Sequence, residues 1–432
     1  MQIQKIDSAG IPEIIAALQS DLVSISHGGQ TPDFETAYSP LGAGCNPSVN
    51  LDELEVRAIK AIIVERQQQL DAVRLKASNL GLFKESALVR KLRWRLLDQE
   101  AKITESQNTH RRIISALWRF PTEILSLIFV YCLPKNKFLS PRPQTAPLLL
   151  TRVCRRWRMV AVDMPSLWCG LSVGKERRLS AFSYESWLKR SRGCPLSLAL
   201  HCRNNNDWAE SRNLIHPYIN QVSSLALHTD YNVSLPVISD FLALERLAVY
   251  RSPCSMQDLV RSISQSPSTL RSLNIPYPQF ELESLSAFEP ALWAHLTNVQ
   301  ITVDQLNTIC HLLHLCPDLS SLSVDISNNS KQILEPFTHT KLQSLQVFFT
   351  GFKYGAIRPI PCGIFNAVTL PDLRVLKARA MRAWPHENFK AFLIRSNCPL
   401  KSLTLGYEVE TTEEQRAEYI ALIPSLVVER YP

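Results

Sequence analysis

The fold is decided by a six-residue pattern that is clearest in Leu270-Arg-Ser-Leu-Asn-Ile275 and Leu319-Ser-Ser-Leu-Ser-Val324. Apolar residues occupy the first, fourth and sixth positions, and the residues between them are small, polar or charged. Alternation over the last three residues suits a short strand whose large side chains face a core. Each copy of the pattern therefore predicts one strand with one buried face.

The pattern occurs nine times in the second half of the chain, and helix-like pieces such as 256–264, 303–315 and 388–395 lie between copies. The spacings between central residues are 22, 26, 26, 23, 23, 31, 27 and 23, which match leucine-rich repeats with one stretched unit. The repeats are degenerate, because the usual Asn or Cys after the pattern is mostly absent. We expect a curved α/β solenoid over 173–432, with 196–200 as an additional strand. The central residues are Leu225, Leu247, Leu273, Val299, Leu322, Leu345, Leu376, Leu403 and Leu426.

The residues between the apolar positions would line the exposed face of this sheet. They are mostly small and polar, with a positive residue near each end of the row. A face of this kind can bind a protein, but small polar side chains also suit tightly curved strands, and the sequence leaves both explanations open. The candidate target-binding residues are Arg246, Asn274, Gln300, Ser323, Gln346 and Lys377.

Residues 51–115 predict a pair of long helices with a heptad pattern, preceded by a flexible N-terminal segment over 1–50 that contains a short amphipathic stretch at 11–25. The helices would fold back as an antiparallel hairpin, or pair with a second chain as a homodimeric coiled coil over 51–106; the pattern allows either. The three/four spacing is seen in Val56, Ile59, Ile63, Arg66, Leu70, Val73, Ala77 and Leu80, and then in Val89, Leu92, Leu96 and Ile103.

Two shorter helical runs follow within residues 116–172. The first begins Phe120-Pro-Thr-Glu-Ile-Leu125 and the second contains Val153-Cys-Arg-Arg-Trp-Arg158 before Pro165-Ser-Leu-Trp168. Pro suits the first turn of a helix, and Glu123 lies near its positive end. The apolar faces are wider than so small a unit can cover, and we place Ile124 and Ile128 with their neighbours Leu125 and Phe129 on the free face. An uncovered apolar face predicts a partner protein.

These two runs resemble an F-box, and with the preceding hairpin they resemble the large fungal (basidiomycete-type) F-box-like families with degenerate leucine-rich repeats. Phe120 stands where that family usually has Leu, and a charged, Pro-rich loop separates the helices. The resemblance implies a receptor that links an unidentified target protein to a Skp–cullin–F-box ubiquitin ligase for ubiquitin-dependent degradation. It assigns contacts with the Skp-type adaptor to Phe120, Pro121, Glu123, Ile124, Leu125, Ile128, Phe129, Leu150, Val153, Cys154, Arg155, Trp157 and Trp168. For Trp157 and Trp168 the sequence also allows a role in the internal core of the small unit, and that role is the favoured one.

The net charge of +8 belongs to one segment: residues 51–178 carry +12, residues 1–50 carry −4 and the rest is neutral. Clustered Lys and Arg can bind nucleic acid or an acidic protein, or can simply keep the outer faces of helices hydrated. We expect the adaptor implied by the resemblance rather than nucleic acid. A scaffold that retains the F-box-like fold outside any ligase is the alternative, and nucleic-acid association through the basic helices is a further one.

No catalytic motif is present: the sequence has no GxGxxG, Walker loop, HExxH or GxSxG pattern. We therefore expect a non-catalytic interaction protein with no cofactor and no metal. The apolar run 124–133 is too short to cross a bilayer, and no basic and apolar leader precedes it, so we expect no membrane partner and a location in the cytoplasm, the nucleus or both. The eleven scattered Cys residues are expected to be free thiols.

Overall fold

The computed structural model describes residues 34–40, 51–81, 87–115, 120–135, 137–175, 181–230, 233, 238–250, 256–327, 334–349, 363–379, 384–406 and 409–430. The predicted amphipathic stretch at 11–25 lies outside these residues. The chain divides into two compact units, one of residues 1–128 with 153–160 and one of residues 129–152 with 161–432. Among the described residues, no helix combines the length and the hydropathy needed to cross a membrane.

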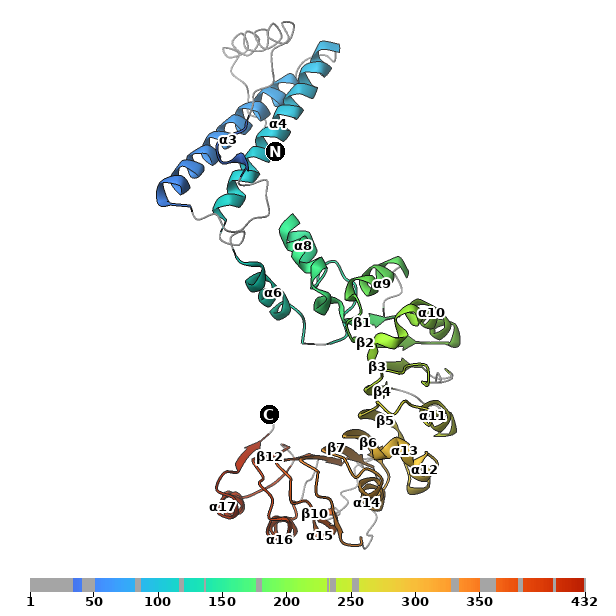
Figure 1. The fold of residues 1–432 in the computed structure, drawn as a ribbon. Coiled ribbons are helices and arrows are strands. Elements are labelled where there is room, and N and C mark those ends of the chain that lie inside the picture. The colour runs from blue at the N-terminus through green and yellow to red at the C-terminus, as the bar shows by residue number, and fades with distance from the viewer. Residues whose placement is uncertain are drawn as a thin grey trace. The chain divides into compact units, whose positions relative to one another are not determined.

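The first unit is built on a helical hairpin of α3 (Glu53–Leu80) and α4 (Ala87–Ile114) (Figure 1). Asp52 begins α3 with a capping box, in which its side chain accepts a hydrogen bond from the Glu55 backbone N–H. All eight α3 positions of the predicted heptad seam are buried or half-buried, which confirms the seam. Of the two arrangements that the pattern allows, the structure shows the antiparallel hairpin within one chain. Its apolar end consists of Leu80, Leu92 and Leu96 with Val73, Ala77 and Val89 packed against them.

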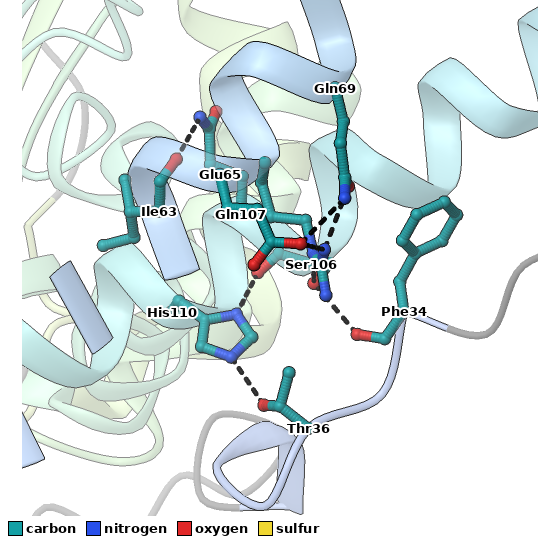
Figure 2. Close-up of polar contacts among 9 residues, drawn as sticks. Phe34, Thr36, Ile63, Glu65, Gln69, Ser106, Gln107 and His110 are labelled. Carbon is teal, nitrogen blue, oxygen red and sulfur yellow. Dashed lines mark hydrogen bonds and ion pairs between the residues drawn. The ribbon is translucent and has the colours of Figure 1, made fainter. Parts of the chain in front are cut away.

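The other end of the hairpin buries polar side chains (Figure 2). Arg66 occupies a heptad position, where its Nε donates to Ser106 Oγ (3.3 Å) and its guanidinium lies 5.2 Å from the centre of the Phe34 ring. His110 is fully buried; its Nδ1 donates to the Ser106 carbonyl oxygen (2.6 Å) and its Nε2 accepts from the Thr36 hydroxyl (2.7 Å). Segment 34–40 is thereby bonded to both helices.

Of the two helical runs predicted within 116–172, the structure shows the first as one helix and divides the second into two. The first is α6 (Thr122–Tyr131), and the second is divided into α7 (Leu150–Val153) and α8 (Arg155–Asp163). The division falls at Cys154, whose Sγ accepts a hydrogen bond from the Trp157 backbone N–H (3.4 Å), as an N-cap side chain would. A 3-10 turn, η1 (Pro165–Trp168), follows.

The second unit contains an 11-stranded, wholly parallel sheet whose strands are hydrogen-bonded in chain order. A separate two-stranded sheet pairs β8 (Phe337–Thr338) with β10 (Val368–Thr369). The strands of the large sheet are β1 (Gly170–Val173), β2 (Leu196–Cys202), β3 (Val222–Thr229), β4 (Arg246–Tyr250), β5 (Ser272–Phe280), β6 (Asn298–Val303), β7 (Ser321–Ile326), β9 (Ser344–Phe349), β11 (Val375–Arg379), β12 (Ser402–Leu405) and β13 (Val427–Arg430).

Helices cover the outer side of this sheet, and the strands line its inner side (Figure 1). This alternation of strand and helix makes the second unit an α/β solenoid-like stack. The helices are α9 (Ala181–Leu188), α10 (Asn205–Ile215), α11 (Met256–Ile263), α12 (Leu282–Ser286), α13 (Pro290–Ala294), α14 (Leu306–Leu315), α15 (Gly363–Ala367), α16 (His386–Ser396) and α17 (Glu413–Leu422), with 3-10 turns η2 (Lys189–Ser191) and η3 (His216–Gln221).

The strand register confirms eight of the nine predicted copies. From Leu225 to Leu403, every predicted central residue is paired with the next and is buried. The additional strand predicted at 196–200 is β2. The ninth copy is wrong by two residues, because Leu403 is paired with Val428 and not with Leu426. Pro424 interrupts that copy, and β13 is paired on one side only, so neighbouring strands fix its register less strongly.

Candidate functional site

Helix α6 carries an exposed apolar row that follows helical spacing. Ile124, Leu127 and Tyr131 are 43 %, 53 % and 81 % exposed, and Ile128 is half-buried beside them. These positions are i, i+3, i+4 and i+7, so their side chains share one side of the helix. Exposed apolar side chains in such a row leave the helix with a free binding face.

Two of the four residues predicted for this free face are instead interior. Leu125 and Phe129 are fully buried, so their placement on the exposed face is wrong. The physical reason is that α6 is apolar on two sides, and Leu125 is about 100° around the helix from Ile124. The exposed row includes Leu127 and Tyr131, which the prediction missed; their i+3 and i+7 spacing from Ile124 was the available signal.

The start of α6 is attached to α8 by an arginine. The Arg156 guanidinium is buried and donates a hydrogen bond to the carbonyl oxygen of Phe120, which is half-buried. Arg156 therefore has an internal role, and the basic cluster expected to meet an acidic partner is reduced to exposed neighbours such as Arg155 and Arg158. Pro121 and Glu123 are exposed in the first turn of the helix.

The remaining predicted adaptor contacts differ in accessibility. Val153 is exposed, Cys154 and Trp157 are half-buried, and Leu150 is buried. Trp168 is fully buried as well, so its side chain is not on a surface that a partner could reach. The prediction of Leu150 as a contact residue is corrected accordingly, and of the two roles that the sequence allows for Trp168 the structure shows the core role.

Trp168 is buried because it joins the first repeats of the second unit. Its indole N–H donates to the Ala161 carbonyl oxygen (2.8 Å), and the Trp187 indole N–H donates to the Trp168 carbonyl oxygen (2.9 Å). The two rings meet edge to face at 5.0 Å, and the Arg190 guanidinium lies 4.5 Å from the Trp168 ring centre. These contacts give Trp168 a packing role.

A second surface is the face of the sheet that points away from the helices. Five of the six predicted target-binding residues lie in one line across it, since Asn274, Gln300, Ser323, Gln346 and Lys377 are paired in register on β5, β6, β7, β9 and β11. Arg246 lies one row away, paired with Ser272. All six side chains are exposed or half-buried. The structure thus brings together residues that are up to 103 positions apart in the chain.

A further row on this face, two residues after the first, was missed by the prediction. On β2, β3 and β4 it consists of His201, His228 and Tyr250, whose rings stack in register. Ring centres are 4.3 Å apart between the histidines and 4.7 Å apart between His228 and Tyr250, with interplanar angles of 7° and 14°. Each of these residues directly follows the last apolar position of a strand, which was the sequence signal that could have identified the row.

The same row contains charged and aromatic residues farther along the sheet. Asp325, Phe348 and Arg379 are paired in register on β7, β9 and β11. The Arg379 guanidinium lies 5.3 Å from the Phe348 ring centre, and burial raises the pKa of the Asp325 carboxyl. At the other end, burial, His228 and Lys175 lower the pKa of His201 to about 4, so its ring is neutral near pH 7.

Glycines stand beside both ends of this row. A Cβ on Gly174, which has a φ of +78°, would collide with the His201 carbonyl oxygen. A Cβ on Gly406 would lie 3.2 Å from Arg379 Cα. The backbones therefore approach each other closely at both ends, which only Gly permits without displacement. Among the described residues, no group of three or more His, Cys, Asp and Glu side chains is arranged to hold a metal ion.

Comparison with models of protein families finds no match, and no curated protein sequence matches the chain. Among solved structures, the chain is similar to one in the crystal structure of the Rad7 and Elc1 complex of yeast. That similarity has 14 % sequence identity and a TM-score of 0.31, and covers 80 % of this chain and 98 % of the other. At this TM-score it supports no conclusion about partners.

Proposed function

We propose that this protein is a non-catalytic substrate receptor of a cullin-RING ubiquitin ligase. In this proposal, α6 docks a Skp-type adaptor, and the inner face of the leucine-rich-repeat-like sheet holds a target protein for ubiquitin transfer by other subunits. The F-box resemblance of residues 118–170 suggests the adaptor. The observation that carries the proposal is the exposed apolar row of Ile124, Leu127 and Tyr131.

The energetics of the row favour a protein partner. Burial of one large apolar side chain contributes roughly 1.5–3 kcal/mol, so three or four of them can supply the centre of an interface. Exposed Arg155 on α8 and Arg152 on α7 add positive charge to this part of the chain, which suits an acidic adaptor. In the hairpin, by contrast, Arg74 is paired with Glu100 and Lys102 with Asp98, which makes these cations less suited to phosphate binding.

The test is co-purification of the full chain with a purified Skp-type adaptor. The double variant Ile124→Glu/Leu127→Glu should lower the recovered adaptor at least tenfold, because it places two charges in the apolar row. Both residues are exposed, so the fold should survive, and circular dichroism verifies this. The matched control is Leu75→Glu on α3, which changes an exposed leucine (63 %) outside α6. Undiminished adaptor recovery by the double variant would contradict the docking site.

A second measurement separates a ligase subunit from a scaffold. If the adaptor-bound chain also captures purified cullin, and a target accumulates when the proteasome is inhibited, the receptor role is supported. Adaptor binding without cullin recruitment would favour the scaffold. Retention on nucleic acid that falls steeply with salt would instead favour the basic helices as a nucleic-acid surface.

A further inference from the structure

We propose that the ring stack of His201, His228 and Tyr250, together with the amide row that begins at Asn274 and ends at Lys377, forms one binding track for an extended peptide segment of the target. The segment would place an aromatic side chain at the ring stack and acidic side chains at Lys377 and Arg379. This inference rests on the proposed function, because it specifies which part of a target the sheet would hold.

An acceptor without a donor marks the junction of the two parts of the track. Asn274 Nδ2 donates to the Tyr250 hydroxyl oxygen (3.2 Å), whereas Asn274 Oδ1 is buried and has no hydrogen-bond partner among the described residues. A buried polar atom left unpaired is costly, and a donor from a ligand would remove that cost. The Tyr250 hydroxyl still has its own proton to donate. The Tyr250 hydroxyl proton is therefore the group of this pair that a peptide carbonyl oxygen can accept, and Asn274 Oδ1 becomes available to a peptide N–H only if its amide group turns outward.

The row beyond Asn274 continues this chemistry at regular intervals. Gln300, Ser323 and Gln346 follow on successive strands, about 4.8 Å apart. Each amide carries both a donor and an acceptor, and the serine hydroxyl can act as either. An extended backbone presents alternating N–H and C=O groups, so neutral bifunctional side chains in a line suit a peptide better than they suit a chain of phosphates.

The two ends of the track differ in charge. At the ring stack, His201 is neutral near pH 7, and the three stacked rings offer an aromatic surface to the ligand. At the other end, Lys377 and Arg379 place two cations two positions apart on β11, and the carboxylates of Asp325 and Glu429 lie in the same two rows but two strands away. The two cations are neighbours on one strand and the carboxylates are farther off, so this strand favours acidic residues in the bound segment.

The geometry fixes the spacing between the two anchors. Tyr250 lies on β4 and Lys377 on β11, which are five strand-to-strand steps apart in the sheet order. At roughly 4.8 Å a step the path is about 24 Å, and an extended chain covers about 3.3 Å per residue. The aromatic and acidic residues of the ligand should therefore be about seven positions apart, or slightly fewer because the path follows the inner curve.

The test uses the full chain and a phage-displayed library of random 16-residue peptides as the probe. Selected peptides should carry an aromatic residue and, about five to eight positions away in either direction, a pair of acidic residues. Fluorescence anisotropy of a labelled selected peptide should show at least tenfold weaker binding by Tyr250→Ala and by Lys377→Glu. The matched controls are Tyr277→Ala and Lys401→Glu, which change exposed residues outside the track and should stay within twofold.

The outcomes of the peptide experiment can be distinguished from those of the adaptor co-purification that tests the proposed function. A selection that yields no peptide sensitive to both track variants overturns the track, even if the chain binds its adaptor normally. Peptide binding that persists in Ile124→Glu/Leu127→Glu while adaptor recovery is also unchanged would overturn the docking site and leave the track in place. A single-stranded RNA oligonucleotide that binds more tightly than the peptides and is lost on Lys377→Glu would overturn the peptide assignment.

Discussion

In the hairpin, the seam between α3 and α4 buries Arg66, Gln107 and His110, whereas the interior of the sheet is a ladder of leucine and valine. The ladder is periodic, so each strand stacks on the next through equivalent contacts, as in other repeat structures. The polar contacts at one end of the seam do not repeat, although the seam positions follow heptad spacing, because each polar group there has its own partners. Hydrophobic burial stabilises both regions, but directional hydrogen bonds can specify which residues of α3 face which residues of α4.

The largest change in stability is expected from a substitution that removes one of the buried leucine side chains of the sheet. Leu322→Ala removes a fully buried side chain from β7, near the middle of the sheet, and should lower the free energy of unfolding by about 3 kcal/mol. Urea unfolding followed by tryptophan fluorescence measures it. Ser323→Ala, on the same strand but on the other face, should change stability by less than about 0.5 kcal/mol. Equal midpoints for the two variants would contradict the assignment of the buried face.

The ladder is also the part of the fold that a single sequence predicts best. Each copy repeats the same spacing of apolar residues, so an error in one copy is corrected by its neighbours. The ninth copy has only one neighbour and contains Pro424, and it is the copy whose register was misplaced. The division of a predicted helix at Cys154 was missed for a related reason, since it depends on one local hydrogen bond.

The surfaces were less predictable than the core. Helix α6 is apolar on two sides, and periodicity alone could not tell which side would be covered, so Leu125 was placed outside and Leu127 was not considered. Five of the six residues predicted for one face of the sheet do lie in one row on it, because every second residue of a strand shares a face. The ring stack was missed because it lies one step beyond the repeated pattern. The contact of Phe34 with Arg66 joins residues that are far apart in the sequence and belong to no common pattern. The sequence around either residue therefore does not predict it.

The second test concerns the buried polar groups of the hairpin and asks whether they stabilise it independently of the sheet. His110→Ala removes both hydrogen bonds of a fully buried ring, to the Ser106 carbonyl oxygen and the Thr36 hydroxyl. We expect the hairpin to lose about 2 kcal/mol of stability, because Thr36 and Ser106 then have to find new partners. Hydrogen exchange should accelerate in 34–40 and in both helices, with the sheet unaffected.

Asn108→Ala is the matched control, since Asn108 is exposed on the same helix. It should leave exchange in segment 34–40 unchanged. If His110→Ala also leaves exchange there unchanged, the polar seam does not hold the segment. Faster hydrogen exchange throughout the sheet would show instead that the hairpin and the sheet are not stabilised separately.

The smallest change in stability is expected from the partly exposed ion pair between α16 and α17 in the second unit. Lys390 on α16 and Glu418 on α17 form an ion pair, and the His386 ring lies 3.5 Å from the same carboxylate. The Lys390 hydrogen bond lowers the pKa of Glu418, and the Glu418 hydrogen bond raises the pKa of Lys390. A lowered carboxyl pKa stabilises the folded state above the unfolded value of 4.5, and this contribution is lost as the pH falls through the folded pKa.

A raised lysine pKa has the opposite sense: it stabilises the folded state below the unfolded value of 10.5 and is lost as the pH rises through the folded pKa. Glu418→Gln should therefore lower the melting temperature by only about 1–2 °C between pH 5 and 10, and the difference should shrink at both extremes. Glu410→Gln removes an exposed carboxylate and should not lower the melting temperature over this pH range. A pH-independent difference for Glu418→Gln would mean that the ion pair does not contribute through charge, and that other contacts between α16 and α17, such as the hydrogen bond of His386 with the Tyr419 hydroxyl, hold the helices together.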